Sequence, residues 1–258
     1  MNSMCLTLDQ IKKKISKRTK AILYVAVYGN ADEIDLIENY CKKKKLFLIV
    51  DAAAALGSKF KKKHISKYGI FSVHSFFSDK TITTGEGGML LTDSNKLLKI
   101  CNYYKHDGRK ERGEDTIKIS GYNFRFTELQ AAVGLAQTKK LNSFISRKKE
   151  IYKKYEKKLE KVKQIKVFNY SKFCDPVPHR IVILTKTKSS LLRKFLNKAG
   201  IGVRSLFMPM HRQPIYNIKR KFKNSEILYS TGVCLPSAPS LKDKEINYVC
   251  NKIKKFFN

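Results

Sequence analysis

A strand–helix–strand pattern near the start of the chain constrains the fold more than any other feature. Residues 21–28 and 46–50 are continuous apolar runs of strand length, and an amphipathic segment lies between them. Asp32 or Asn30 is predicted to cap this helix, whose apolar face is formed by Ile34, Ile37, Tyr40 and Cys41. Such a unit predicts an α/β fold whose sheet is parallel and covered on both faces.

The later segments extend this pattern and then change it. Residues 71–77 and 89–92 are predicted strands, and residues 95–104 a helix. Thr127 is predicted to cap a helix from Glu128 to about Lys140 whose buried side is formed by Leu129, Ala132, Val133 and Ala136. A long charged helix follows over residues 142–162. Beyond it we expect a strand at 179–184, a helix at 189–198, a strand at 201–207 and a helix at 243–257. We therefore divide the chain into a cofactor-type domain (1–141), a connecting helix (142–164) and a small α+β domain (165–258).

The charge of the chain raises the question of an anionic partner. The 54 Lys and Arg residues outnumber the 21 Asp and Glu residues, giving a net charge of +33. The basic residues are spread along the whole sequence and show no nucleic-acid motif, so the pattern favours solvated helix faces over a nucleic-acid partner. The six cysteines form no CxxC pair and no metal-ligand spacing. With no apolar run long enough to cross a membrane and no secretory leader, they predict a cytoplasmic protein without a metal site.

Two residues stand out as candidates for chemistry. Asp51 directly follows a buried strand, at the edge where ligands bind in parallel sheets. Lys80 follows another apolar strand and precedes the glycines at 85, 87 and 88, so partial desolvation is expected to make its amine a nucleophile. The residues alone leave a structural alternative open, in which Asp51 begins a turn and Lys80 is a surface lysine.

Longer strings of residues decide between these alternatives. Residues 50–57 (VDAAAALG), 75–88 (SFFSDKTITTGEGG) and 121–132 (GYNFRFTELQAA) occur in this order, followed by 208–214 (MPMHRQP) and 235–241 (LPSAPSL). Together they resemble the DegT/DnrJ/EryC1/StrS family of sugar aminotransferases, which use pyridoxal phosphate, and the last two are similar to members that make perosamine. The resemblance implies the type I fold of pyridoxal-phosphate enzymes.

The resemblance also implies a role for individual residues. Lys80 matches the lysine that binds the cofactor as a Schiff base and then moves a proton between the cofactor and the sugar. Asp51 matches the aspartate that pairs with the pyridinium nitrogen, Ser75 a hydroxyl that binds the phosphate, and Asn123 an asparagine that reaches the phosphate of a partner subunit in a homodimer. Arg125, Arg204 and His211 lie in segments that approach the nucleotide sugar.

The sequence departs from the family pattern at several positions. Ala54 stands beside the expected cofactor ring, where the family usually has Gln or Glu, and Ala26 replaces a usual His. Asp107 and Gly108 replace a usual His-Gly pair. The resemblance also begins inside the cofactor domain, so we expect that about a third of a typical member, including a phosphate-binding helix start and a stacking aromatic residue, is missing from this chain.

The resemblance therefore predicts transamination of a nucleotide-linked 4-keto-6-deoxy sugar for cell-surface polysaccharide synthesis, with glutamate as the amino donor. Some dehydratases of the family carry His at the Lys80 position, so the lysine here argues for transamination. Two alternatives remain: an inactive or split-gene fragment that functions only with a separately encoded N-terminal segment, and a basic nucleic-acid-binding protein.

Overall fold

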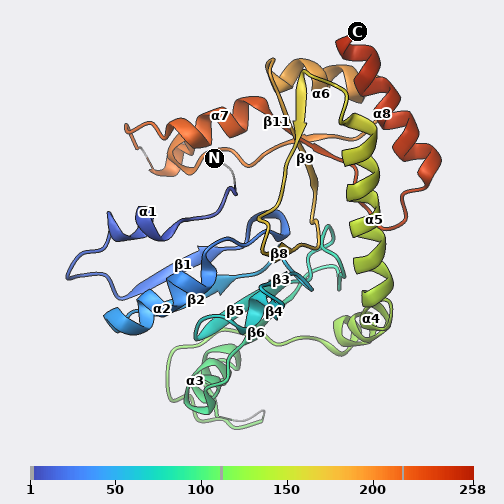
Figure 1. Ribbon diagram of the computed structural model, residues 1–258. Helices are drawn as coiled ribbons and strands as arrows, with labels where there is room; N and C mark the ends of the chain where they lie inside the picture. The colour runs from blue at the N-terminus through green and yellow to red at the C-terminus, as the bar shows by residue number, and fades with distance from the viewer. Residues whose placement is uncertain (1–2, 111–112, 217) are drawn as a thin grey trace.

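A four-stranded sheet forms where the sequence predicts the cofactor-type fold. The computed structural model describes residues 3–110, 113–216 and 218–258. The sheet order is β1-β2-β5-β6, and its first three strands are parallel (Figure 1). Its strands are β1 (Ala21–Val25), β2 (Phe47–Asp51), β5 (Phe71–Ser75) and β6 (Gly88–Leu91). The predicted, mainly parallel sheet is confirmed, and β6 is its exception: it runs antiparallel to β5 because the loop joining them contains no crossover helix.

The two faces of this sheet differ in burial. Tyr24, Val50 and His74 point to a buried face, where α1 (Leu8–Lys12) and α2 (Ile34–Lys44) supply the helix residues of the core. Leu23, Val25 and Phe47 point to the other face and are exposed. The prediction that both faces are covered is therefore wrong for the described chain, because α1 and α2 pack on one side of the sheet.

The start of α2 also differs from the prediction. Neither Asn30 nor Asp32 caps the helix; the N-cap is Glu33, in a left-handed conformation with φ of 49°. Asn30 is fully buried, and its amide nitrogen donates to the Ser3 carbonyl at 2.8 Å. The Asn30 side chain, one of the two predicted caps, therefore makes a tertiary hydrogen bond to Ser3 instead of capping α2.

A second, antiparallel sheet with strand order β10-β11-β9-β7 lies above the first (Figure 1). Apolar residues of three helices pack against it and form a separate core. The strands are β7 (Ile165–Val167), β9 (Ile181–Thr185), β10 (Arg204–Ser205) and β11 (Gly232–Leu235), and the helices are α5 (Leu141–Leu159), α6 (Ser189–Lys198) and α8 (Asp243–Phe257). Helix α7 (Lys223–Thr231) precedes β11, and the sequence patterns predicted neither element.

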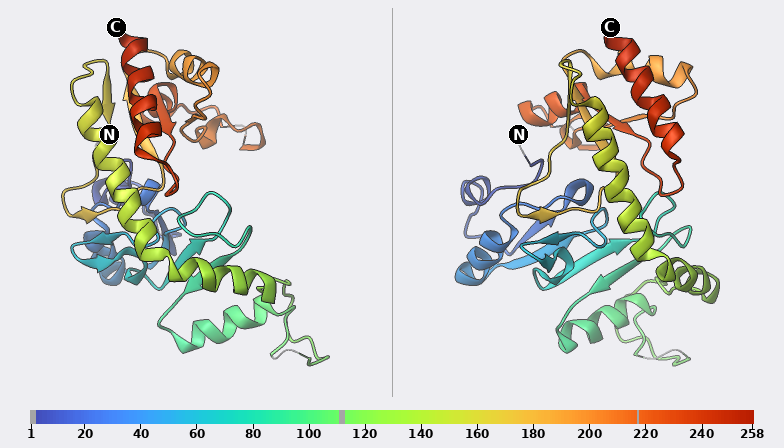
Figure 2. Two further views of the ribbon diagram at one scale, coloured as in Figure 1. Left: turned by 90° about the vertical axis from the view of Figure 1, so that its right-hand side faces the viewer. Right: turned by 45° about the vertical axis from the view of Figure 1, so that its right-hand side comes forward.

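Helix α5 connects the two sheets along one side of the molecule (Figure 2). A small third sheet also joins the two halves of the chain, because its strand β8 pairs with β3. Its members are β3 (Lys59–Phe60), β4 (Lys63–His64) and β8 (Cys174–Asp175). The domain boundaries after residues 141 and 164 stay a prediction.

Helix α4 (Glu128–Lys139) lies at the lower end of α5, and helix α3 (Asn95–Lys105) lies below the first sheet (Figure 1). Thr127 caps α4 as predicted, since its hydroxyl accepts a hydrogen bond from the Gln130 amide at 3.2 Å. The predicted burial of α4 is wrong for the single chain. Leu129 is 81% exposed and Leu135 68% exposed, because α4 lies beyond the two main cores.

Candidate active site at the carboxyl edge of the parallel sheet

Asp51 and Ser75 share one face of the parallel sheet. Asp51 is the last residue of β2 and is paired in register with Val73 of β5. Ser75 lies two residues further along β5 and therefore points to the same face as Asp51. Both side chains are half-buried. The sheet thus brings a carboxylate and a hydroxyl to one face at its carboxyl edge, as the position of Asp51 in the sequence predicts.

Hydrogen bonds within the loops hold both side chains in place. The Asp51 carboxylate accepts from the amide of Ala53 at 3.0 Å, and the Ser75 hydroxyl accepts from the amide of Phe77 at 3.2 Å. Ala54 lies in the turn after β2 and is half-buried. Its methyl group supplies no hydrogen bond at a position where the family pattern expects a polar side chain.

Lys80 lies in the loop that follows β5. Its amide donates to the Phe77 carbonyl at 3.0 Å, which closes a tight turn over residues 77–80. The side chain is half-buried and faces a cavity of about 460 Å³. The cavity walls come from this turn, from α5, from the start of β9, and from the loops before β10 and after β11. Lys80 therefore lies at the junction of the two sheets.

The cavity is also lined by four acidic or basic side chains that the sequence patterns did not indicate: Asp79, Lys148, His179 and Arg180. Asp79 and Arg180 form an ion pair at 2.5 Å. Lys148 lies on α5 in one apolar stripe with Ile151, Tyr155 and Leu159. A lysine at a core position of an amphipathic helix is a signal that could have identified it from the sequence.

The electrostatics of the cavity follow from burial. Lys148 is 3% exposed, and its amine donates to the carbonyls of Pro178, His179 and Ser237 at 3.4 Å each. Burial and the nearby Arg180 lower the pKa of Lys148 to about 8. Burial, together with the charges of Lys80, Arg180 and Lys148, lowers the pKa of His179 to about 4, so its ring is neutral at pH 7.

Several buried polar atoms at the cavity lack a partner in the described structure. Both ring nitrogens of His179 and Oδ1 of Asp79 accept or donate no hydrogen bond, although His179 Nε2 lies 3.5 Å from Asp79 Oδ1. Unpaired buried polar atoms are costly unless water or a ligand satisfies them. The residues beside Lys80 thus fit a polar group such as a cofactor or a substrate.

Asn123 and Arg125 lie on a different part of the molecule, next to the turn at residues 106–108. Arg125 donates from Nε to the Asn123 side-chain oxygen at 3.0 Å and pairs with Asp107 at 3.4 Å. Gly108 has φ of 78°, and a Cβ there would lie 1.7 Å from the Ile119 carbonyl oxygen. Asp107 and Gly108, which depart from the family pattern, therefore form a tight turn here, and Arg125 contacts this turn through Asp107. The described chain does not bring Asn123 to Lys80.

The remaining two predicted site residues, Arg204 and His211, differ in their position relative to the Lys80 cavity. Arg204, the first residue of β10, lines the Lys80 cavity and is exposed. The His211 side chain is only 6% exposed, and its Nε2 lies 2.7 Å from the Glu226 carboxylate of α7. The structure thus brings Arg204, but not His211, to the wall of this cavity.

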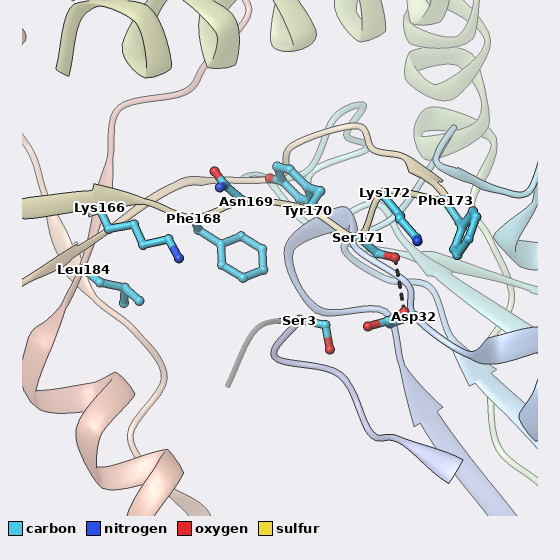
Figure 3. A pocket seen from close by; sticks show the side chains of 10 residues that line it. All are labelled: Ser3, Asp32, Lys166, Phe168, Asn169, Tyr170, Ser171, Lys172, Phe173 and Leu184. Carbon is cyan, nitrogen blue, oxygen red and sulfur yellow. Dashed lines mark hydrogen bonds between the residues drawn. The ribbon is translucent and has the colours of Figure 1, made fainter. Parts of the chain in front are cut away.

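A larger cavity of about 540 Å³ lies elsewhere, between the N-terminal segment and the strand β7–β8 connection (Figure 3). Its lining includes Ser3, Tyr170, and the hydroxyl of Ser171, which donates to Asp32 at 3.1 Å. None of the predicted site residues lines it.

In the described residues we find no group of three His, Cys, Asp or Glu side chains arranged for a metal, and no helix long and apolar enough to cross a membrane.

Comparison with curated proteins gives consistent relatives. The chain is 37% identical to the GDP-perosamine synthase of Escherichia coli O157:H7 over 256 residues, which cover 98% of this chain and 70% of that protein. It is 32% identical to the GDP-perosamine synthase of Vibrio cholerae, with 99% and 71% covered.

Solved structures show the same fold. The aminotransferase PseC of Helicobacter pylori, which takes part in the biosynthesis of pseudaminic acid, superposes with a TM-score of 0.94 at 26% identity and covers 100% of this chain and 72% of its own. The type I fold that the resemblance implied is therefore confirmed. The family model of the DegT/DnrJ/EryC1/StrS aminotransferases matches residues 1–254, and the chain belongs to this family.

Proposed function

We propose that this chain transfers an amino group to a nucleotide-linked 4-keto-6-deoxy sugar, with pyridoxal phosphate as cofactor. The observation that supports the proposal is that Asp51 and Ser75 share one face at the carboxyl edge of the parallel sheet, with Lys80 in the loop that follows the same strand as Ser75. The GDP-perosamine synthases among the relatives favour a GDP-linked sugar of this class.

Each of these three residues has a role that suits its chemistry. The amine of Lys80 would hold the cofactor through its aldehyde carbon and then move a proton to and from the reacting carbon of the sugar. The Asp51 carboxylate would hold a proton on the ring nitrogen, and the Ser75 hydroxyl would donate to the phosphate. When bound, pyridoxal phosphate supplies a ring that accepts the electron pair of the broken C–H bond.

Charge at the cavity wall supports binding of an anionic substrate. Lys148, Arg180 and Arg204 line the same space as Lys80, against the single carboxylate of Asp79. We assign Arg204 to the nucleotide sugar, whose diphosphate is a suitable partner for an exposed guanidinium. Arg125 and His211 are retained as substrate contacts, although Arg125 would need to act across an interface and His211 is engaged by Glu226.

A homodimer would explain two features of the α4 region. Leu129 and Leu135 are exposed on α4, and the neighbouring Tyr122 and Phe124 stack at 5.0 Å while also exposed. A helix that is apolar on several sides is normally buried. Asn123 lies between these aromatic residues in the sequence, so a second copy packed here would place Asn123 at the interface, where the family resemblance expects it to reach the partner's phosphate.

The proposal has three further parts. Glutamate as amino donor and a place in cell-surface polysaccharide synthesis rest on the family resemblance, and a cytoplasmic location rests on sequence features. The six cysteines of the sequence are free thiols in the structure, which suits a reducing compartment.

The proposal is tested by supplying the full chain with pyridoxal phosphate, glutamate and GDP-4-keto-6-deoxymannose. We expect the amino sugar nucleotide to appear by mass spectrometry, and none in the Lys80→Ala variant. Absence of product with correctly folded wild-type chain would favour the inactive-fragment alternative. Product formed equally by Lys80→Ala would contradict the role of Lys80.

A further inference from the structure

The turn that carries Lys80 is attached to the second sheet by one side chain. Asp79 Oδ2 lies 2.5 Å from the guanidinium of Arg180, the residue immediately before β9, although 101 positions separate the two residues. The other hydrogen bonds of residues 77–80 in the described structure stay within their own loop. Asp79 is therefore the link between the Lys80 turn and the opposite wall of the cavity.

Arg180 is suited to act as a fixed anchor because the backbone beside it is held from several sides. The His179 amide donates to the Tyr28 carbonyl at 3.2 Å, and the His179 carbonyl accepts from Lys148 and from the Ser237 hydroxyl. These partners lie on three different segments of the chain. A carboxylate that pairs with the Arg180 guanidinium is therefore held by a segment whose backbone is fixed.

The Asp79–Arg180 pair also has the burial that makes an ion pair effective. The Asp79 side chain is 30% exposed and that of Arg180 20% exposed, so solvent screens their attraction less than at the open surface. Burial raises the pKa of Asp79, but His179 (once it is protonated at low pH) and the charges of Arg180 and Lys80 outweigh it and lower the pKa overall. The carboxylate is thus charged at pH 7.

We propose that Asp79 is a positioning residue for Lys80: its ion pair with Arg180 fastens the turn at residues 77–80 to the start of β9 and keeps the Lys80 amine facing the cavity. The inference rests on the proposed function only for the role of Lys80 in holding the cofactor. The tether itself is a property of the folded chain.

The first test measures the turn without any cofactor. Amide hydrogen exchange of the peptide covering residues 76–83 is compared in wild type, Asp79→Asn, Arg180→Gln and the double variant. We expect each single variant to exchange at least about five-fold faster at residues 78–81, and the double variant no faster than the faster single one. Asp79→Glu, which keeps the charge, should restore part of the protection.

A matched control removes an ion pair of the same length. Lys149 and Asp175 pair at 2.5 Å and connect α5 to β8, away from the Lys80 cavity. Asp175→Asn should leave exchange at residues 76–83 unchanged. Wild-type exchange at these residues in Asp79→Asn, or equal acceleration in Asp175→Asn, would overturn the tether.

The second test asks whether the tether positions the amine. Each folded variant is treated with pyridoxal phosphate and borohydride, and labelling of Lys80 is measured relative to other lysines in the same sample. We expect selective labelling of Lys80 to fall several-fold in Asp79→Asn and to be retained in Asp175→Asn. Equal labelling in wild type and Asp79→Asn would overturn the positioning role. Faster exchange in Asp79→Asn with no selective label in wild type would support the tether and contradict the proposed function.

Discussion

Asp51 and Ser75 point to the same face of the parallel sheet, from the carboxyl ends of two neighbouring strands. The pairing of Asp51 with Val73 places Ser75 one two-residue step, or about 6.6 Å, further along β5. The two backbone positions are also separated by one strand spacing of about 4.8 Å across the sheet, so the two side chains are neighbours on one face without touching each other's strand position. The Lys80 turn follows directly from the same strand.

The role of Asp51 predicts the effect of neutralising it. Asp51→Asn keeps the size of the side chain but removes the charge that would hold a proton on the cofactor ring. We expect transamination to fall by about 10²–10³-fold, the typical loss when a group that stabilises developing charge is removed. Steady-state kinetics with added cofactor measures the loss. A rate close to wild type would show that Asp51 only shapes the turn through Ala53.

The buried Lys148 predicts a pH dependence of stability. Its pKa is about 8 in the folded chain against an ordinary value of 10.5, so the unfolded chain binds the proton more tightly. The free energy of unfolding should therefore rise with pH between about 8 and 10.5, by an amount on the order of 3 kcal/mol from this group.

Lys148→Met isolates this contribution. The free energy of unfolding of the variant, taken relative to that of wild type, should be higher at pH 7 than at pH 10.5. Urea unfolding at both pH values measures this difference. The same substitution at the exposed Lys157 of α5 serves as control and should show no such difference. A constant difference between Lys148→Met and wild type across this pH range would contradict the assignment.

The exposed apolar side chains of α4 predict self-association. Leu129→Lys and Leu135→Lys would each bury a charge in the interface. We therefore expect the Kd of the dimer to rise by at least about tenfold in each variant. Analytical ultracentrifugation measures the equilibrium, with Thr138→Lys on the same helix as control. An unchanged assembly state in both leucine variants would place the interface elsewhere.

The sequence predicts local elements well where a single helix or strand carries its own signal. Helices at residues 189–198 and 243–257 have the predicted bounds, and the Thr127 cap is confirmed. Each depends on the periodicity of side chains within the element or on a cap next to it. The same is true of Asp51, which the end of an apolar run identifies.

Features that depend on distant contacts were not predictable in this way. Strand β11 has four residues and is defined by its pairing with β9 and β10, and the Asp79–Arg180 pair joins positions 101 residues apart. The amphipathic pattern of α4 also indicated a buried face without showing what covers it. Side-chain periodicity reports that a face is apolar, whereas its burial depends on the rest of the assembly.

The proposed role of Lys80 in holding the cofactor can be tested by chemical labelling of the folded protein. The folded full chain is incubated with pyridoxal phosphate, reduced with borohydride, digested and mapped by mass spectrometry. We expect the phosphopyridoxyl group on the peptide containing Lys80 well above the level on any other lysine, and we expect Lys80→Ala to remove this label. A label spread evenly over the many surface lysines, or concentrated on a different lysine, would show that Lys80 does not hold the cofactor.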